Sequence, residues 1–259
     1  MRSARENTST QTEVFEKGIR NTFLMRDAVA NAAKLLAEPA RAAMLLQLMG
    51  GRAVPAGELA LAARVSPQTA SEHLSRLTEA GFVTANRQGR HRYYELANEE
   101  IAYAVESLLV LSSAPSAGSH ARTCTKAVGP SPGSLEHART CYSHLAGWLG
   151  VAITDALQRE GYLAPVAGRA FTVTDRGRAW FEQRGIAVPP SAGVADLKPA
   201  RQCPDWTERR PHLAGTLGVS MYKRFSELGW VVPSRKSRAV RVTLDGREAF
   251  FRYLRIVVG

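Results

Sequence analysis

The stretch that decides the fold is Val54–Leu96, which reads VPAGELALAARVSPQTASEHLSRLTEAGFVTANRQGRHRYYEL. Its apolar residues recur at helical spacing in two segments, which predicts a short helix over residues 58–63 and a second helix over about 67–80. Ser66 is a favourable N-cap for the second helix, because its hydroxyl can accept a hydrogen bond from a backbone amide of the first turn.

A strand pair with a basic tip is expected after the second helix. Residues 82–84 and 90–96 have the composition of strands, and residues 86–89 between them predict a turn. The order helix, turn, helix and hairpin is that of a winged helix-turn-helix, whose second helix enters the DNA major groove. A solvated polar helix beside an ordinary basic hairpin is the alternative. The candidate DNA-binding residues are Ser66, Gln68, Thr69, Ser71, Glu72, His73, Arg76, Arg87, Arg90, His91 and Arg92.

Four segments of the N-terminal part carry a family resemblance. They are LLAEPAR (35–41), GELA (57–60), SPQTASEHL (66–74) and GRHRYY (89–94). Over about residues 25–113 the chain resembles the ArsR/SmtB-type winged-helix repressors. The resemblance implies a homodimer that binds double-stranded operator DNA and releases it when an effector binds. It also implies that the first and last helices of the domain pair across a two-fold axis.

The composition favours a polyanionic partner. The 259 residues carry a formal net charge of +11, and the sequence pI ≈ 10.1. Nucleic-acid binding would gain from counterion release, although an acidic membrane surface would suit the charge equally well. No apolar run approaches the ~20 residues of a membrane span, and no signal peptide is expected at the polar N-terminus. Three cysteines do not form a disulfide scaffold, which predicts a reducing, cytoplasmic location.

The winged helix-turn-helix is expected within a domain of residues 21–113 that follows a flexible tail of residues 1–20. Further helices are predicted over residues 23–37, 39–49 and 98–111. Apolar side chains recur at helical spacing along the last of these helices. This stripe suits the implied two-fold pairing, and the alternative is that it packs inside one chain.

The second half of the chain contains an internal repeat. HLAGWLGV at 144–151 matches HLAGTLGV at 212–219, and each precedes the same succession of helix, strand, strand and helix. A linker rich in serine, glycine and proline is expected at residues 114–136. Two winged-helix-like repeats should follow, at residues 137–190 and 191–259. The predicted fold class is mainly α with small β-hairpin wings (α+β).

These repeats are expected to lack a DNA-reading helix. Only nine residues lead from Ala152 to Gly161, too few for a turn and a full reading helix. The C-terminal half would then be a sensing or dimer-stabilising module. Basic residues of the second repeat could add DNA contacts, although a solvated loop explains them equally well. They are Arg235, Lys236, Arg238 and Arg241.

Two metal sites known in the resembled family are not carried over to this chain. Residues 57–62 contain no cysteine and residues 98–113 contain no histidine. Cysteine and histidine recur in the repeats instead, and the four would converge if the repeats pack about a pseudo-two-fold axis. They are Cys141, His144, Cys203 and His212.

Thiolate and imidazole together suit a zinc, copper(I), haem-iron or trivalent arsenic centre. Without a metal, a thiolate whose pKa is lowered by Arg139, Arg209 or a charged histidine could sense oxidants. The alternative is that these cysteines are inert packing residues. The resulting expectation is a dimeric regulator, an effector-responsive repressor whose effector is a metal, oxidant or small molecule. A constitutive DNA-binding accessory protein is the first rival. A C-terminal enzyme is the second, although the sequence carries no catalytic motif.

Overall fold

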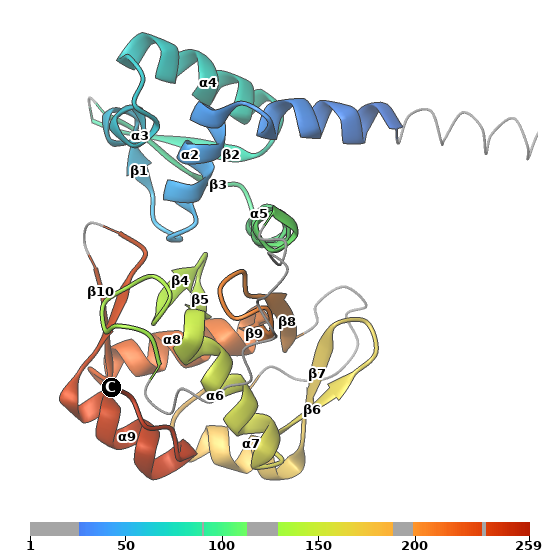
Figure 1. Ribbon diagram of the computed structural model, residues 1–259, viewed down its shortest axis with the longest axis vertical. Coiled ribbons are helices and arrows are strands. Elements are labelled where there is room, and N and C mark those ends of the chain that lie inside the picture. The colour runs from blue at the N-terminus through green and yellow to red at the C-terminus, as the bar shows by residue number, and fades with distance from the viewer. Residues whose placement is uncertain (1–25, 90, 113–128, 189–198, 235–236) are drawn as a thin grey trace, which may run out of the picture.

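The computed structural model describes most of the chain. The described residues are 26–89, 91–112, 129–188, 199–234 and 237–259. The rest of the N-terminal domain and the C-terminal half lie on opposite sides of helix α5 (Glu99–Ser112). Helix α4 (Pro67–Glu79) lies at the end of the molecule that is farthest from the C-terminal helix (Figure 1). In the part that the structure describes, no helix has the length and hydropathy needed to cross a bilayer.

The N-terminal domain is a winged helix-turn-helix. An exposed helix over residues 26–36 comes first, and a three-stranded antiparallel sheet in the order β1-β3-β2 closes the domain. The other elements are α2 (Pro39–Leu48), β1 (Val54–Pro55), α3 (Ala56–Ala63), α4, β2 (Val83–Gln88), β3 (His91–Leu96) and α5.

Local chemistry sets the ends of these helices, and the predicted cap at Ser66 is confirmed. The Ser66 hydroxyl accepts a hydrogen bond of 3.1 Å from the amide of Thr69 and caps α4. Asn98 caps α5 through a 3.0 Å bond from the amide of Ile101 to its side-chain oxygen. Arg64 takes a left-handed conformation that ends α3 and makes the break before Ser66.

The predicted turn over residues 86–89 is wrong. Strand β2 continues to Gln88, which pairs with His91, and Arg87 pairs with Arg92. The loop therefore contains only Gly89 and residue 90, which lies outside the described residues. Two-residue loops match the twist of a hairpin and need positive φ, and Gly89 has φ +61°.

The C-terminal half contains two units with the same order of elements. The first unit has β4 (Arg139–Cys141), β5 (His144–Ala146), α6 (Gly147–Arg159), β6 (Leu163–Val166), β7 (Ala170–Val173) and α7 (Asp175–Glu182). The second has β8 (Arg201–Pro204), β9 (Pro211–Ala214), α8 (Gly215–Glu227), β10 (Val231–Pro233), β11 (Val240–Val242) and α9 (Leu244–Leu254). The strands form a four-stranded sheet in the order β6-β7-β8-β9 and two separate pairs, β4-β5 and β10-β11.

The two units share local details as well as element order. Thr174 caps α7 by accepting a hydrogen bond from Gly177, and Thr243 caps α9 by accepting one from Gly246. Neither glycine can carry a side chain, because a Cβ atom would lie 2.1 Å from a carbonyl oxygen in both places.

Two expectations about this half need correction. The hairpins β4-β5 and β8-β9, which precede the long helices, are absent from the sequence prediction. Helix α6 begins at Gly147 and has 13 residues, as many as α4. The expectation that the repeat is too short for a full reading helix is therefore wrong. Burial, not length, distinguishes α6 from α4. Nine residues of α6 are buried, whereas α4 buries three.

Helix α5 is packed between the two halves. Glu106 on α5 is fully buried, 3.7 Å from Arg139 and 3.4 Å from Arg238, both of the C-terminal half. The amide of Tyr142 donates a 2.7 Å hydrogen bond to the carbonyl oxygen of Met49 at the end of α2. The two halves therefore share a buried ionic and hydrogen-bonded interface.

Candidate nucleic-acid interface and a buried cysteine–histidine cluster

Helix α4 has one buried face and one exposed polar face. Ala70, Leu74 and Leu77 are fully buried and pack the helix against the domain core. The opposite face therefore points to solvent. Of the candidate residues on α4 and its cap, Ser66, Gln68, Ser71, Glu72 and Arg76 are exposed, and Thr69 and His73 are half-buried.

Several of these side chains are engaged within the domain. Ser66 is occupied by the cap, and the Ser71 hydroxyl donates a 2.9 Å hydrogen bond to the carbonyl oxygen of Pro67. His73 Nδ1 lies 3.4 Å from the guanidinium of Arg41. These contacts stabilise the helix and make the three side chains less available to a ligand. Among the described residues of this face, the side chains that extend freely are Gln68, Glu72 and Arg76.

The wing presents cationic side chains to solvent. Arg87, His91 and Arg92 are exposed, and Arg90 lies outside the described residues. The guanidinium of Arg92 lies over the ring of Tyr94, 5.7 Å from its centroid, in a cation–π contact. Exposed arginines on a hairpin tip are suited to contacts with phosphates.

One basic residue of the second unit is placed differently from either sequence interpretation. Arg238 is neither a DNA contact nor a solvated residue, because its side chain is only 9% exposed and pairs with Glu106. Arg241 is exposed, whereas Arg235 and Lys236 lie outside the described residues.

Cys141, His144, Cys203 and His212 meet in the interior, and we call them the Cys2His2 cluster. Each unit supplies one cysteine and one histidine as cross-strand partners, because Cys141 pairs with His144 in β4-β5 and Cys203 pairs with His212 in β8-β9. The two Sγ atoms lie 3.9 Å apart and the two Nε2 atoms 3.1 Å apart. The four ligand atoms all lie within 4.8 Å of one another, and all four residues are buried.

Helix glycines bring the two units close enough for this meeting. A Cβ atom on Gly150 of α6 would lie 3.5 Å from the Cβ atom of His212. A Cβ atom on Gly218 of α8 would lie 3.3 Å from that of His144. Each long helix therefore packs directly against the histidine of the other unit, and a larger residue at either glycine would separate them.

Carboxylates stand behind both histidines. His212 Nδ1 lies 3.1 Å from the buried carboxylate of Asp205, and His144 Nδ1 lies 3.8 Å from Glu99 on α5. Asp205 also lies 3.0 Å from Arg139 and accepts a 2.8 Å hydrogen bond from the amide of Gly147. The cluster is thus connected to α5 on one side and to the start of α6 on the other.

The electrostatics of the cluster favour a thiolate and an imidazolium. The hydrogen bond from Cys141 and the charge of His212 outweigh burial and hold the pKa of Cys203 well below its usual range. The same hydrogen bond and burial raise the pKa of Cys141. Burial lowers the pKa of His212, but the charge on Cys203 and the contacts with Asp205 raise it to about 10. Of the cations that the sequence analysis named as candidates, His212 acts on Cys203.

The carboxylates Glu106 and Asp205 complete this site, and neither is among the functional residues predicted from the sequence. Burial disfavours the charged form of Asp205, but His212 and Arg139 hold its pKa well below the usual range. The sequence gives little indication that either is buried. A glutamate beside a helical apolar stripe and an aspartate after a proline are most often surface residues.

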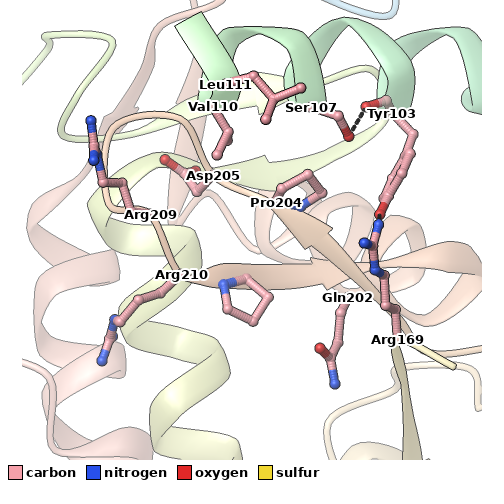
Figure 2. Close-up of a pocket in the computed structure, with 11 residues that line it drawn as sticks. Tyr103, Ser107, Val110, Leu111, Arg169, Gln202, Pro204, Asp205, Arg209 and Arg210 are labelled. Carbon is pink, nitrogen blue, oxygen red and sulfur yellow. Dashed lines mark hydrogen bonds between the residues drawn. The ribbon is translucent and has the colours of Figure 1, made fainter. Parts of the chain in front are cut away.

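A pocket of ≈ 370 Å³ lies between α5 and the hairpin β8-β9. Figure 2 shows Val110 and Leu111 of α5 above it and Pro204 at its centre. Arg209 and Arg210 lie on one side of the pocket and Arg169 lies on the other. Apolar walls with flanking arginines suit a small organic anion. Because Asp205 also lines it, the pocket adjoins the Cys2His2 cluster.

Comparison with known proteins connects the chain to a family. Residues 36–85 match the helix-turn-helix domain family. The chain is 39% identical over 234 residues to the uncharacterized HTH-type transcriptional regulator YdfF of Bacillus subtilis, covering 90% of this chain and 100% of YdfF.

Shorter relatives match about a third of the chain. The transcriptional regulator CmtR of Mycobacterium bovis is 36% identical over 89 residues, 34% of this chain and 75% of CmtR. Among solved structures, the homodimeric winged helix-turn-helix DNA-binding domain of a possible ArsR-family regulator from Mycobacterium bovis is 30% identical. That match covers 35% of this chain and 83% of the domain, with a TM-score of 0.32.

Proposed function

The chain belongs to the ArsR/SmtB-type helix-turn-helix transcriptional regulators, and we propose that it is a dimeric, effector-responsive repressor that binds operator DNA. The observation that carries the proposal is the exposed polar face of α4, which is braced by a fully buried apolar stripe. A helix held in this way can enter the major groove with Gln68, Glu72 and Arg76 free to contact base edges.

The side chains of α4 and those of the wing would have different roles in DNA recognition. Gln68 suits an adenine edge, Arg76 suits a guanine edge, and Glu72 can accept a hydrogen bond from cytosine. Arg87 and Arg92 on the wing would contact phosphates, which adds affinity without sequence preference. Specificity would then reside in α4, and the salt dependence of binding largely in the wing.

Exposed apolar side chains support the proposed dimer. Val29 on the first helix is 70% exposed, and Leu108 and Leu111 on α5 are 45% and 75% exposed. Val105 and Glu106 of α5 are buried against the rest of the chain, so α5 has one face inside the protomer and another that is free. Pairing of the free face with a second copy would bury these side chains and supply two reading heads.

The C-terminal half is proposed as a sensing or dimer-stabilising module built from two winged-helix-like repeats. Its support is the set of contacts with α5 through Glu99 and Glu106. A ligand that shifts the C-terminal half would move α5, and hence the spacing of the two reading helices. The pocket beside α5 and the Cys2His2 cluster are the candidate sites for such a ligand. The reducing cytoplasm remains the proposed location.

The test is selection of duplexes from a random pool by the purified full-length chain. We expect enrichment of a two-fold symmetric sequence whose half-sites lie about one helical turn apart. Gln68→Ala and Arg76→Ala should each weaken binding to the enriched duplex and relax preference at one base pair per half-site.

Failure to enrich any duplex at low salt would overturn the proposal. Enrichment with an affinity that no metal, oxidant or small anion changes would instead favour the constitutive accessory protein. The two outcomes separate DNA binding from its regulation.

A further inference from the structure

We propose that the Cys2His2 cluster is a closed, four-coordinate zinc site that joins the two C-terminal units. Neither unit contains the full set of ligands, because each contributes one cysteine and one histidine. The site therefore exists only when the hairpins β4-β5 and β8-β9 face each other. Its existence does not depend on the proposed DNA-binding function.

The distance between the two sulfur atoms and that between the two nitrogen atoms match a tetrahedral zinc site. Zinc–sulfur and zinc–nitrogen bond lengths place two thiolates about 3.8 Å apart and two imidazole nitrogens about 3.3 Å apart around a tetrahedron. The corresponding distances here are 3.9 Å between the Sγ atoms and 3.1 Å between the Nε2 atoms. The four ligand atoms lie within 4.8 Å of one another, whereas a sulfur–nitrogen pair in such a tetrahedron is about 3.6 Å apart, so the side chains would close in by up to about 1 Å around the ion.

The orientation of the imidazole rings also points to a cation. A carboxylate beside Nδ1 favours the tautomer that carries its proton there, which leaves the lone pair on Nε2. Asp205 stands beside Nδ1 of His212, and Glu99 stands on the same side of His144. The two Nε2 atoms then face one another at 3.1 Å, where a proton or a metal ion can lie between them.

The chemistry and enclosure of the cluster select zinc among the metals that cysteine and histidine bind. Two sulfur and two nitrogen ligands in a tetrahedron are typical of structural zinc sites, which have all four positions filled by protein. A haem would need space for its macrocycle between the axial ligands, and 3.1 Å between the two Nε2 atoms leaves none. All four residues are at most 2% exposed, so zinc exchange should be slow.

Zinc would connect segments that are far apart in the chain. The two cysteines are separated by 62 residues and the two histidines by 68. Because the histidine ligands adjoin Glu99 and Asp205, the ion would also hold the start of α5 and of α6. We therefore expect zinc to be part of the folded state, with a stability effect measurable without DNA.

The test is titration of the reduced, metal-free, full-length chain with cobalt(II) and then zinc(II). Cobalt(II) serves as a spectroscopic probe because tetrahedral cobalt absorbs strongly in the visible, and each thiolate adds an ultraviolet charge-transfer band. We expect one cobalt per chain, a two-thiolate spectrum and complete displacement by zinc. Zinc should also raise the midpoint of thermal unfolding.

Cysteine variants assign the ligands. Cys141→Ser and Cys203→Ser should each remove about half of the charge-transfer intensity. Cys124→Ser, which removes the third cysteine of the chain, should change neither the intensity nor the stoichiometry. If the ligand variants fail to fold, the wild-type titration alone decides whether the site exists.

Three results would overturn the zinc site. They are a wild-type chain that binds no tetrahedral cobalt, a spectrum that Cys124→Ser diminishes, and a reduced chain that stays metal-free but joins Cys141 to Cys203 in air. The last result would identify the two thiols as a redox pair.

Discussion

At the scale of single residues, Asp205 and Glu106 show how buried charge is organised in this protein. Asp205 faces His212 and Arg139 and accepts hydrogen bonds from Gly147 and Thr207. Glu106 faces Arg139 and Arg238 from the other side. Every one of these charges has a partner of opposite sign, so burial is tolerated, and removing one partner should be costly.

Glu106→Gln should therefore destabilise the protein strongly. The substitution keeps the shape of the side chain but leaves Arg238 as a buried cation with no carboxylate, which costs roughly 3 kcal/mol or more. Glu100→Gln is the matched control, because Glu100 is 70% exposed and its pair with Arg201 is solvated. Chemical denaturation of both variants measures the difference. Equal free energies of unfolding would contradict the structural role of Glu106.

Arg87→Ala should lower the salt dependence of DNA binding. Each lost phosphate contact reduces the slope of log K against log salt by about 0.9, so a dimer should lose about two. Lys223→Ala removes the same charge from α8, far from the wing, and should leave the slope unchanged. Fluorescence anisotropy over a range of salt concentrations gives both slopes. A slope that stays the same in Arg87→Ala would refute the wing assignment.

At the scale of elements, α4 and α6 have equal length and opposite surroundings. α4 exposes most of its surface, whereas α6 is buried among its neighbours. Gly150 permits this burial, because a Cβ atom there would lie 2.5 Å from the carbonyl oxygen of Leu145. Gly218 plays the same part in α8, where the carbonyl of Leu213 lies 2.6 Å away. The contact between the long helix and its hairpin therefore depends on a glycine in both units.

Gly150→Ala should destabilise the protein although alanine is the better helix former. The steric cost of overpacking is about 1–3 kcal/mol, which exceeds the gain in helix propensity of about 1 kcal/mol. Gly57→Ala in α3 meets no atom within 4 Å and should be neutral or stabilising. Thermal unfolding of the two variants should show midpoints that move in opposite directions. A higher midpoint for Gly150→Ala would mean that α6 can move away from β5 without loss.

At the scale of the whole molecule, α5 lies between the rest of the N-terminal domain and the C-terminal half (Figure 1). One face of α5 contacts the C-terminal half through Glu99 and Glu106, and its end carries the exposed Leu111. In the proposed mechanism, this helix would pass a change in the C-terminal half to the second protomer.

The double variant Val29→Glu/Leu111→Glu should shift the protein towards monomer. Glutamates on apposed copies of the proposed dimer face would place unpaired charges in an apolar contact. Operator affinity should fall by about 10²-fold or more, because the second reading head is no longer tethered. Leu244→Glu is the control, since Leu244 is 80% exposed on α9. Analytical ultracentrifugation of the variants reports the change, and a dimer that survives the double substitution would place the interface elsewhere.

The sequence alone determined the features that depend on neighbouring residues. The Ser66 cap, the buried stripe of α4 and the presence of a two-strand wing follow from local spacing, and the structure confirms them, although the turn of the wing is shorter than predicted. The equivalent positions of His144 and His212 also followed from the repeated motif. These predictions succeed because hydrogen bonds and side-chain contacts within one turn or one hairpin are set by residues close in the chain.

Only the tertiary structure decided which distant residues meet. The hairpins β4-β5 and β8-β9, the pairing of Arg238 with Glu106, and the distances within the Cys2His2 cluster all depend on how the two units pack. No local pattern marks Glu106 or Asp205 as buried, because the arginines that pair with them, Arg139 and Arg238, lie tens of residues away in the chain. Burial distinguishes α4 from α6 for the same reason: a helix of given length becomes a reading element or a core element according to what packs around it.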